Sequence, residues 1–151
     1  MADTQSIKEL RDRTGISMAE CKKALDASGG DVEKALEVLR ERGVEMAGKK
    51  SDRELGAGVI SSYIHAGGLI GTLVEIACET DFVSKNEDFR AMAEDIAMHI
   101  AATSPADVAE LLTQEYIKNP SLTVEALIQQ GTQKFGERIV LAKFSRFEIG
   151  A

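Results

Sequence analysis

The sequence predicts an α+β fold in which an N-terminal module of three helices precedes a small antiparallel sheet packed with helices. Residues 1–43 carry apolar side chains at three- and four-residue spacing, and a β-hairpin pattern follows at about residues 59–79. Two helical patterns follow the hairpin, and a further strand pattern then closes the chain. Early and late strands with helices between them favour a sheet that helices cover on one side.

The first segment, residues 1–43, is expected to form three short helices. Gly15 ends the first helix, and Ser17 with Glu20 forms a capping box for the second. Asp31 follows a glycine pair and caps the third helix. Because each helix is too short to be stable alone, their apolar faces must meet in one small core. Such a compact unit resembles ubiquitin-associated modules.

Residues 44–57 are expected to be a linker, because this stretch is small, polar and charged. Its basic side chains, Lys49 and Arg53 among them, either contact an acidic partner or belong to a solvated segment that keeps two parts of the chain apart. Solvation is the commoner role of such a charge run. Residues 58–151 then form the core.

The core is expected to open with a β-hairpin. Residues 59–65 and 69–79 are rich in β-branched side chains, and Ala66-Gly67-Gly68 supplies the turn. The second arm is almost continuously apolar, which is typical of a buried strand, so the residues that follow it stand on a rigid support. Phe82 beside Asp81 is unusual at such a polar corner. Either the chain's own core or a partner must cover the ring.

Two helices follow the hairpin. The first is expected to start from a cap at Ser84 or Asn86, and the second to run from Thr123 to Gly136. Residues 113–120 between them are expected to be irregular. A closing strand is expected over residues 139–148. Its two faces are expected to carry different apolar side chains, Val140, Ala142 and Phe144 on one and Ile139, Leu141 and Phe147 on the other.

Composition excludes several classes of function. A hydrophobic content of 44% is enough for a real core, and a net charge of -7 works against direct nucleic-acid binding, which needs a basic footprint. No apolar run reaches the ~18 residues of a membrane span, and the N-terminus lacks a signal-peptide pattern. A cytoplasmic protein with a protein partner and no membrane contact is expected.

Signatures of catalysis and metal binding are weak. Cys21 and Cys78 match neither a disulfide framework nor a zinc spacing, and both are expected to be buried thiols. His65 and His99 belong to no metal-binding cluster, and neither a phosphate-binding glycine loop nor a nucleophile elbow occurs. The chain is therefore predicted not to be an enzyme and to need no cofactor. His65 stands beside a glycine turn and is equally suited to ending a hairpin or contacting a partner.

Several motifs resemble the elongation factor Ts family and occur in the order of that family. Those of the helical module are Leu10-Arg11-Asp12-Arg13-Thr14-Gly15, Met18 and Cys21-Lys22-Lys23-Ala24-Leu25. Those of the core include Tyr63-Ile64-His65, Cys78-Glu79-Thr80-Asp81-Phe82-Val83 and Asn86-Glu87-Asp88-Phe89. The resemblance covers nearly the whole chain and thins between about residues 104 and 120.

The resemblance implies a translation elongation factor that acts in protein biosynthesis as a guanine nucleotide exchange factor for elongation factor Tu, a GTPase. By similarity to the family, Thr80, Asp81, Phe82 and Val83 form a wedge that enters beside the magnesium site of this GTPase. Phe82 supplies apolar anchor area and Asp81 a directed acceptor, as in binding hot spots. In the alternative interpretation, Asp81 only caps a helix and Phe82 is buried in the chain's own core.

The resemblance also implies three partner contacts outside the wedge. Arg11 and Met18 match residues of the helical module that touch the GTPase, although Ala19 stands where relatives often repeat the methionine. His65 matches a histidine that approaches the phosphate loop. A long helical segment typical even of short family members is expected to be missing after about Leu112.

Long family members place the acid-aromatic corner and the histidine in two similar core halves, whereas this chain has room for one. The resemblance therefore implies a homodimer in which residues 58–151 are the dimerisation domain. Each GTPase would receive the corner from one copy and His65 from the other. The alternative function is a ubiquitin-associated-like adaptor without exchange activity, which requires an exposed apolar patch around Gly15-Ile16.

Overall fold

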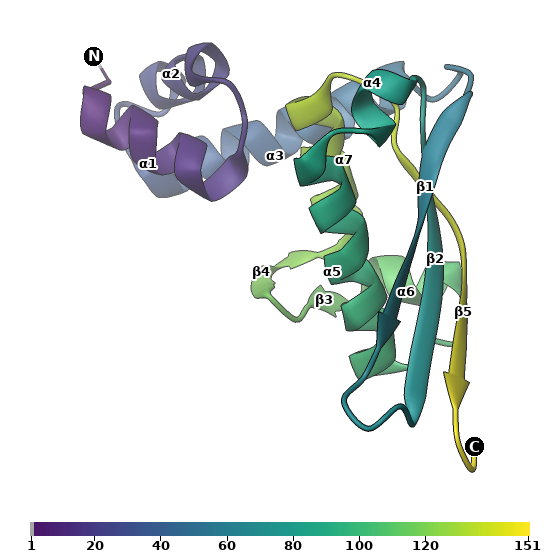
Figure 1. Cartoon of the computed structure of the whole chain (residues 1–151). Coiled ribbons are helices and arrows are strands. Elements are labelled where there is room, and N and C mark those ends of the chain that lie inside the picture. Colours follow the sequence, from purple (N-terminus) through teal and green to yellow (C-terminus); the bar gives the residue numbers. More distant parts are fainter. Residues whose placement is uncertain (1) are drawn as a thin grey trace.

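The computed structural model describes residues 2–151 and has a helical module beside a mixed core (Figure 1). The module consists of α1 (Thr4–Thr14), α2 (Met18–Ala27) and α3 (Val32–Lys49). The core helices are α4 (Asp81–Ser84), α5 (Glu87–Thr103), α6 (Val108–Thr113) and α7 (Val124–Phe135). The strands are β1 (Ala57–Ile64), β2 (Ile70–Cys78), β3 (Glu115–Tyr116), β4 (Asn119–Thr123) and β5 (Val140–Glu148). The predicted α+β class is confirmed, whereas the ubiquitin-associated character of the module stays a prediction.

Local capping defines the module helices as expected. The Ser17 hydroxyl accepts the backbone N–H of Glu20 at 3.3 Å, and Asp31 accepts that of Lys34 at 3.1 Å. Gly15 ends α1 with a positive φ of 70°, a conformation that favours glycine. The predicted caps at Ser17 and Asp31 and the predicted end of the first helix at Gly15 are therefore confirmed.

The third helix is longer than expected, because it continues to Lys49 through the first part of the segment predicted to be a linker. Gly43 and Gly48 lie in this stretch, and glycine has a low helix propensity, which favours a helix end there. Gly43, however, is buried where α3 packs on α7, and a Cβ there would come within 3.1 Å of the Gln133 side chain. The packing therefore explains why the helix tolerates this glycine. The division of the chain into domains stays a prediction.

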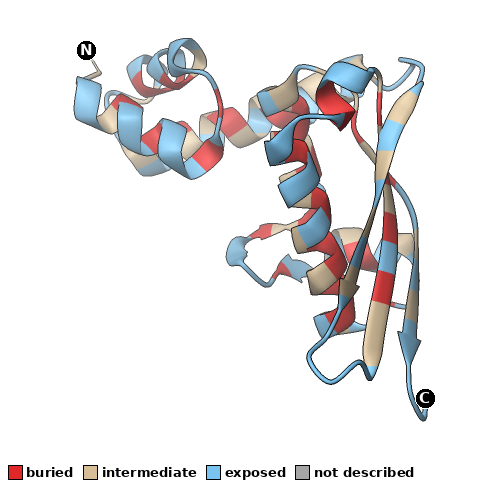
Figure 2. Cartoon of the chain, viewed as in Figure 1, coloured by how far each residue is buried: buried red, intermediate tan, exposed pale blue. Residues whose placement is uncertain are grey.

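The main sheet has the strand order β1-β2-β5 and is antiparallel throughout. Its inner face packs on α5, and the buried side chains of β2 alternate along the strand (Figure 2). These inner residues are Thr72, Val74, Ile76 and Cys78. Leu73 points to the opposite face and is exposed. The prediction that helices cover one side of the sheet is therefore confirmed, and the predicted buried strand is buried on that side.

A β-bulge changes the face of the closing strand. Glu75 pairs with Lys143 but Ile76 pairs with Leu141, so Ala142 is an extra residue without a partner in β2. Beyond this bulge the alternation of β5 is reversed. Leu141 is buried as predicted, but Phe147 lies on the outer face and is exposed. The prediction that they share a face is wrong for this reason.

Residues 113–120 are more ordered than expected, since β3 and β4 pair as a short antiparallel hairpin. Tyr116 and Leu122 anchor it in the core. The fully buried His99 of α5 holds the hairpin: the backbone N–H of Ile117 donates to its Nδ1 at 3.2 Å, and its Nε2 lies 2.9 Å from Gln114 Oε1. Strands this short leave no detectable alternation in the sequence.

The contacts of His99 predict an acid-sensitive fold. Its Nδ1 accepts a hydrogen bond, so Nε2 carries the proton and the ring is neutral. Burial lowers the pKa of His99 from its ordinary value of 6.5, against an opposing effect of the Gln114 hydrogen bond. Below pH 6.5 the unfolded chain therefore binds more protons than the folded one, and the free energy of unfolding falls as the pH drops from there through the lowered pKa.

This loss is expected to follow a slope of at most about 1.4 kcal/mol per pH unit, because one proton is involved. Urea unfolding between pH 7.5 and pH 5 measures it. His99→Gln should flatten the slope, whereas the matched control His65→Gln should keep it because His65 is exposed. An equal slope in all three proteins would contradict the assignment.

Candidate functional site

The corner after β2 presents Asp81 and Phe82 to solvent. Phe82 is 91% exposed, and the Asp81 carboxylate pairs with the ammonium group of Lys85, which is also exposed, at 3.7 Å. The residue at the cap position of α4 is Thr80, not Asp81. The alternative in which Asp81 caps a helix and Phe82 is buried is therefore wrong.

Val83 and Thr80, the other two residues of the predicted wedge, connect the corner to the rest of the core. Val83 is buried and belongs to the same apolar cluster as Cys78 and Phe89. Thr80 is exposed, but its hydroxyl donates to Glu137 Oε2 at 2.5 Å. Of the four wedge residues, Asp81 and Phe82 are therefore the two most accessible to a partner, since the Asp81–Lys85 ion pair is itself exposed.

Glu137 contacts this corner and was not predicted from the sequence. Its Oε1 accepts the backbone N–H groups of Glu79 and Thr80, each at 3.0 Å. It lies between α7 and β5, far along the chain from the residues it binds. Because no spacing rule connects residues so distant, only the tertiary structure reveals the contact.

The β1–β2 turn lies at the opposite end of the sheet from α4 (Figure 1), and His65 directly follows β1 at this turn. It is exposed beside the β1–β2 turn, and its Nδ1 lies 3.0 Å from the Tyr63 hydroxyl. The length of β2 separates it from Asp81 by about 27 Å at a rise of ~3.4 Å per residue. The structure does not bring the histidine and the corner of one chain together.

The helical module reaches the same end of the molecule as the corner. The Lys134 side chain of α7 packs against Gly15, where a Cβ would come within 2.8 Å of it, and its ammonium pairs with Asp88 of α5 at 3.0 Å. Arg11 and Met18 are both exposed on the module. They can therefore contact a partner, although no contact joins them to the corner.

The patch that the adaptor interpretation requires is not present, because Ile16 is only 2% exposed. Its side chain belongs to the core of the helical module. Lys134 lies over the neighbouring Gly15. The structure therefore disfavours the adaptor alternative.

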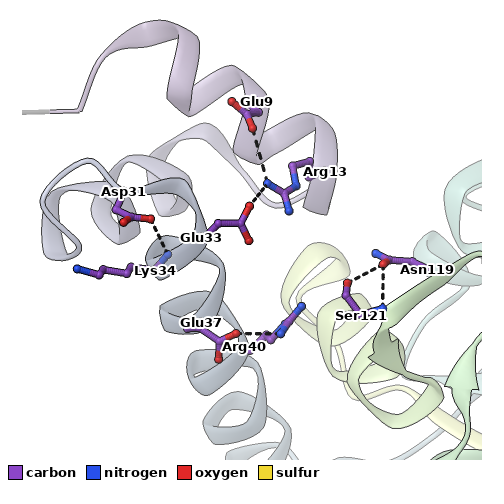
Figure 3. A network of polar contacts seen from close by, with 9 residues as sticks. All are labelled: Glu9, Arg13, Asp31, Glu33, Lys34, Glu37, Arg40, Asn119 and Ser121. Carbon is purple, nitrogen blue, oxygen red and sulfur yellow. Dashed lines mark hydrogen bonds and ion pairs between the residues drawn. The ribbon is translucent and has the colours of Figure 1, made fainter.

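A cavity of about 300 Å³ is lined by residues of the module, of β4 and of α7. Arg13 at its edge pairs with Glu33 at 2.8 Å and with Glu9 at 3.6 Å, and Arg40 pairs with Glu37 at 2.9 Å (Figure 3). Opposite them, the Ser121 hydroxyl donates to Asn119 Oδ1 at 2.6 Å. Since carboxylates of the module neutralise both arginines, the cavity is a poor candidate for an anion site.

Both thiols make hydrogen bonds to nearby backbone: Cys78 Sγ donates to the Thr80 carbonyl at 3.4 Å and Cys21 Sγ to the Ile16 carbonyl at 3.5 Å. Cys21 and Cys78 are both buried and free, as predicted. Burial raises the pKa of each thiol, and the Glu137 carboxylate adds to this effect at Cys78, so both remain protonated near neutral pH. Across residues 2–151, no group of three His, Cys, Asp or Glu side chains could hold a metal ion, and no helix is long and apolar enough to cross a membrane.

Comparison with known proteins identifies the family. The family model described as "Elongation factor TS" matches residues 79–151, which begin at the corner. Elongation factor Ts of Carboxydothermus hydrogenoformans is 40% identical over 195 aligned positions, which cover 99% of this chain and 90% of that protein. The corresponding protein of Desulforamulus reducens is 43% identical, with 95% and 87% covered. The chain belongs to the elongation factor Ts family. The predicted resemblance is confirmed, and membership makes this protein a translation elongation factor.

The chain is shorter than its elongation factor Ts relatives within the aligned region. The alignment to the Carboxydothermus protein has 195 positions and this chain has 151 residues, so at least 44 positions have no counterpart here. Loss of a segment was expected from the resemblance. Its location after Leu112 stays a prediction. In this chain, α6 and the β3–β4 hairpin form the connection between α5 and α7.

Proposed function

We propose that this elongation factor acts as a guanine nucleotide exchange factor, promoting GDP release from elongation factor Tu by disturbing its magnesium and phosphate-loop site. The observation that carries the proposal is the exposure of Phe82, 91%, on a corner whose backbone is held in place. A large aromatic side chain without cover is typical of an anchor that a partner buries. Family membership supports the choice of partner.

The corner suits exchange because no covalent step is needed. Magnesium demands near-ideal octahedral geometry, so a small displacement of the partner's surrounding elements weakens its binding. Phe82 supplies apolar area for a site that opens only in the distorted GTPase, and Asp81 supplies an acceptor beside it. By linkage, the protein lowers the affinity for GDP by the factor by which GDP lowers the affinity for the protein.

The release rate of fluorescently labelled GDP from elongation factor Tu tests the function. The unmutated protein is expected to accelerate release in proportion to its concentration until saturation. Absence of acceleration would end the exchange proposal in favour of the adaptor alternative. The adaptor is disfavoured by the burial of Ile16.

We also propose that the active form is a homodimer that uses the outer face of the sheet. Large apolar side chains of this face and its edge are exposed: Ile60, Ile64, Leu69, Leu73, Phe147 and Ile149. Gly71 keeps the face flat, since a Cβ there would meet the Ile64 side chain at 2.9 Å. Two such faces can stack at the ~10 Å spacing of packed sheets.

A two-fold arrangement explains how one GTPase could meet both contact sites. With the strands of the two copies antiparallel across the interface, the hairpin end of one sheet lies beside the corner end of the other. His65 of one copy would then complement Asp81 and Phe82 of the second. Within a single chain these residues are about 27 Å apart.

Leu73→Asp tests the dimer. Burying an unpaired carboxylate from each copy is expected to raise the dissociation constant of the dimer at least about a hundredfold. Sedimentation of the unmutated and variant proteins measures this. Ile117→Asp is the matched control, since Ile117 is 40% exposed against 48% for Leu73 but lies on the β3–β4 hairpin. A fully active monomer of the unmutated protein would disprove the dimer.

A further inference from the structure

Glu137 binds the backbone immediately before the wedge. One carboxylate oxygen accepts the N–H groups of Glu79 and Thr80 at 3.0 Å, and the other accepts the Thr80 hydroxyl at 2.5 Å. All three donors precede Asp81 by no more than two residues. Hydrogen bonds to a charged acceptor are stronger than those between neutral groups, so this side chain restrains the corner more than a neutral one would.

The corner binds the Glu137 loop in return. The Glu79 carboxylate, 16% exposed, accepts the backbone N–H of Arg138 at 2.5 Å. Its other oxygen lies 3.4 Å from the Arg53 guanidinium, and the Arg138 guanidinium donates to the Arg53 carbonyl at 2.8 Å. Two carboxylates therefore join the end of β2 to the α7–β5 loop and to the segment before β1.

The short helix at the corner depends on this support. α4 spans only Asp81–Ser84, which is too short to be stable by itself. Thr80 stands at its N-cap, yet among the described residues no side chain caps α4. The Thr80 hydroxyl donates to Glu137 instead. Glu137 and the buried Val83 therefore restrain α4, together with the hydrogen bonds that Cys78 Sγ and Arg90 Nε donate to the carbonyls of Thr80 and Ser84.

Phe82 has no support of its own. Its ring is 91% exposed, so its orientation follows that of α4. An anchor that is already oriented loses less conformational entropy when it binds. The geometry thus connects Glu137 to the efficiency of the wedge, although Glu137 does not belong to it.

We propose that Glu137 is a positioning residue, whose carboxylate fixes the Glu79-Thr80 backbone and so holds Asp81 and Phe82 in the orientation in which they enter the partner. This inference rests on the proposed exchange function. A merely structural connection would stabilise the fold without acting through Phe82. The two roles differ in their dependence on the aromatic ring.

Two measurements on Glu137→Ala distinguish these roles. Amide hydrogen exchange reports the protection of the Glu79 and Thr80 N–H groups. The slope of the GDP release rate against protein concentration is measured for Glu137→Ala in two backgrounds, one that keeps Phe82 and one that carries Phe82→Ala. Glu137→Gln serves as the conservative variant, because its amide oxygen can accept both N–H groups. Glu125→Ala is the matched control, an exposed glutamate on α7.

In Glu137→Ala, the protection of both amides is expected to fall at least about tenfold and the slope of GDP release about tenfold, since the lost bonds are charge-assisted. Glu137→Gln is expected to keep most of the amide protection and most of the slope of GDP release. Glu125→Ala is expected to change neither the protection nor the slope. After Phe82→Ala, Glu137→Ala should lower the slope by a smaller factor than it does when Phe82 is present, because only Asp81 then remains for Glu137 to position. Thr80→Val, which removes only the hydroxyl contact, should give a smaller loss and serves if Glu137→Ala unfolds.

Unchanged amide protection in Glu137→Ala would overturn the proposal. An equal loss of slope with and without the Phe82 ring would also overturn it, because Glu137 would then act independently of the wedge. If the unmutated protein fails to accelerate GDP release, the proposed function fails instead. In that case the amide protection alone decides whether Glu137 orients the corner.

Discussion

Replacing Phe82 by alanine is expected to lower the slope of protein-stimulated GDP release from elongation factor Tu about thirtyfold, the effect of about 2 kcal/mol at a binding hot spot. Adding Asp81→Ala is expected to bring the total loss to roughly a thousandfold if the two contributions add. The reason is geometric. Within this chain, Phe82 is exposed and Asp81 makes only a weak ion pair with Lys85, which is exposed and long, at 3.7 Å. Both side chains are therefore accessible to the GTPase.

Two controls separate loss of contact from loss of fold. The Phe82 ring is exposed, so the free energy of unfolding should stay within about 0.5 kcal/mol of the unmutated value. Lys85→Ala removes the exposed partner of Asp81 and should leave GDP release nearly unchanged. A double variant at Asp81 and Phe82 that released GDP as fast as the unmutated protein would rule out this corner as the contact.

Phe89→Ala is expected to have the largest effect on stability. Phe89 has no exposed surface, and its ring meets that of Phe135 edge to face, with centroids 5.7 Å apart and planes at 82°. Removing a buried phenylalanine costs about 3–5 kcal/mol in lost burial and in the cavity left behind. This is a large share of the stability of an ordinary domain.

Urea unfolding at pH 7.5 measures the effect, with Phe82→Ala as the matched control seven positions earlier. Both variants remove the same side-chain atoms, but Phe89 is buried and Phe82 is exposed. Phe89→Ala should therefore lose stability, whereas Phe82→Ala should keep its stability and lose exchange activity. A loss below about 1 kcal/mol in Phe89→Ala would show that α5 and α7 close the cavity, contrary to the packing seen here.

Local interactions explain which parts of the fold could be predicted. Asn86 and Thr123 each accept backbone N–H groups within the next three residues. Gly136 ends α7 with a φ of 72°. Such caps depend on neighbours within one helical turn, so residue type and spacing predict them. The β1–β2 hairpin was predictable for the same reason, because its turn joins two adjacent strands.

Long-range packing explains the errors. The bulge at Ala142 moves Phe147 to the outer face of the sheet. Gly43 packs against α7, and α3 continues through this glycine to Lys49. The His99 side chain holds a hairpin that residue spacing did not indicate. In each case the deciding neighbour is distant in sequence and leaves no periodic pattern near the residue it affects.

The sequence by itself determined the α+β class, the caps of the module helices and the presence of an acid-aromatic pair directly after a strand, because these depend on residue type and on neighbours within a few positions. Only the tertiary structure decided that Phe82 is exposed and that Val83 and Ile16 are buried. The tertiary structure also placed Glu137 against Glu79 and Thr80. Burial and contacts between distant segments arise when the whole chain packs, so they cannot be derived from any short stretch of it.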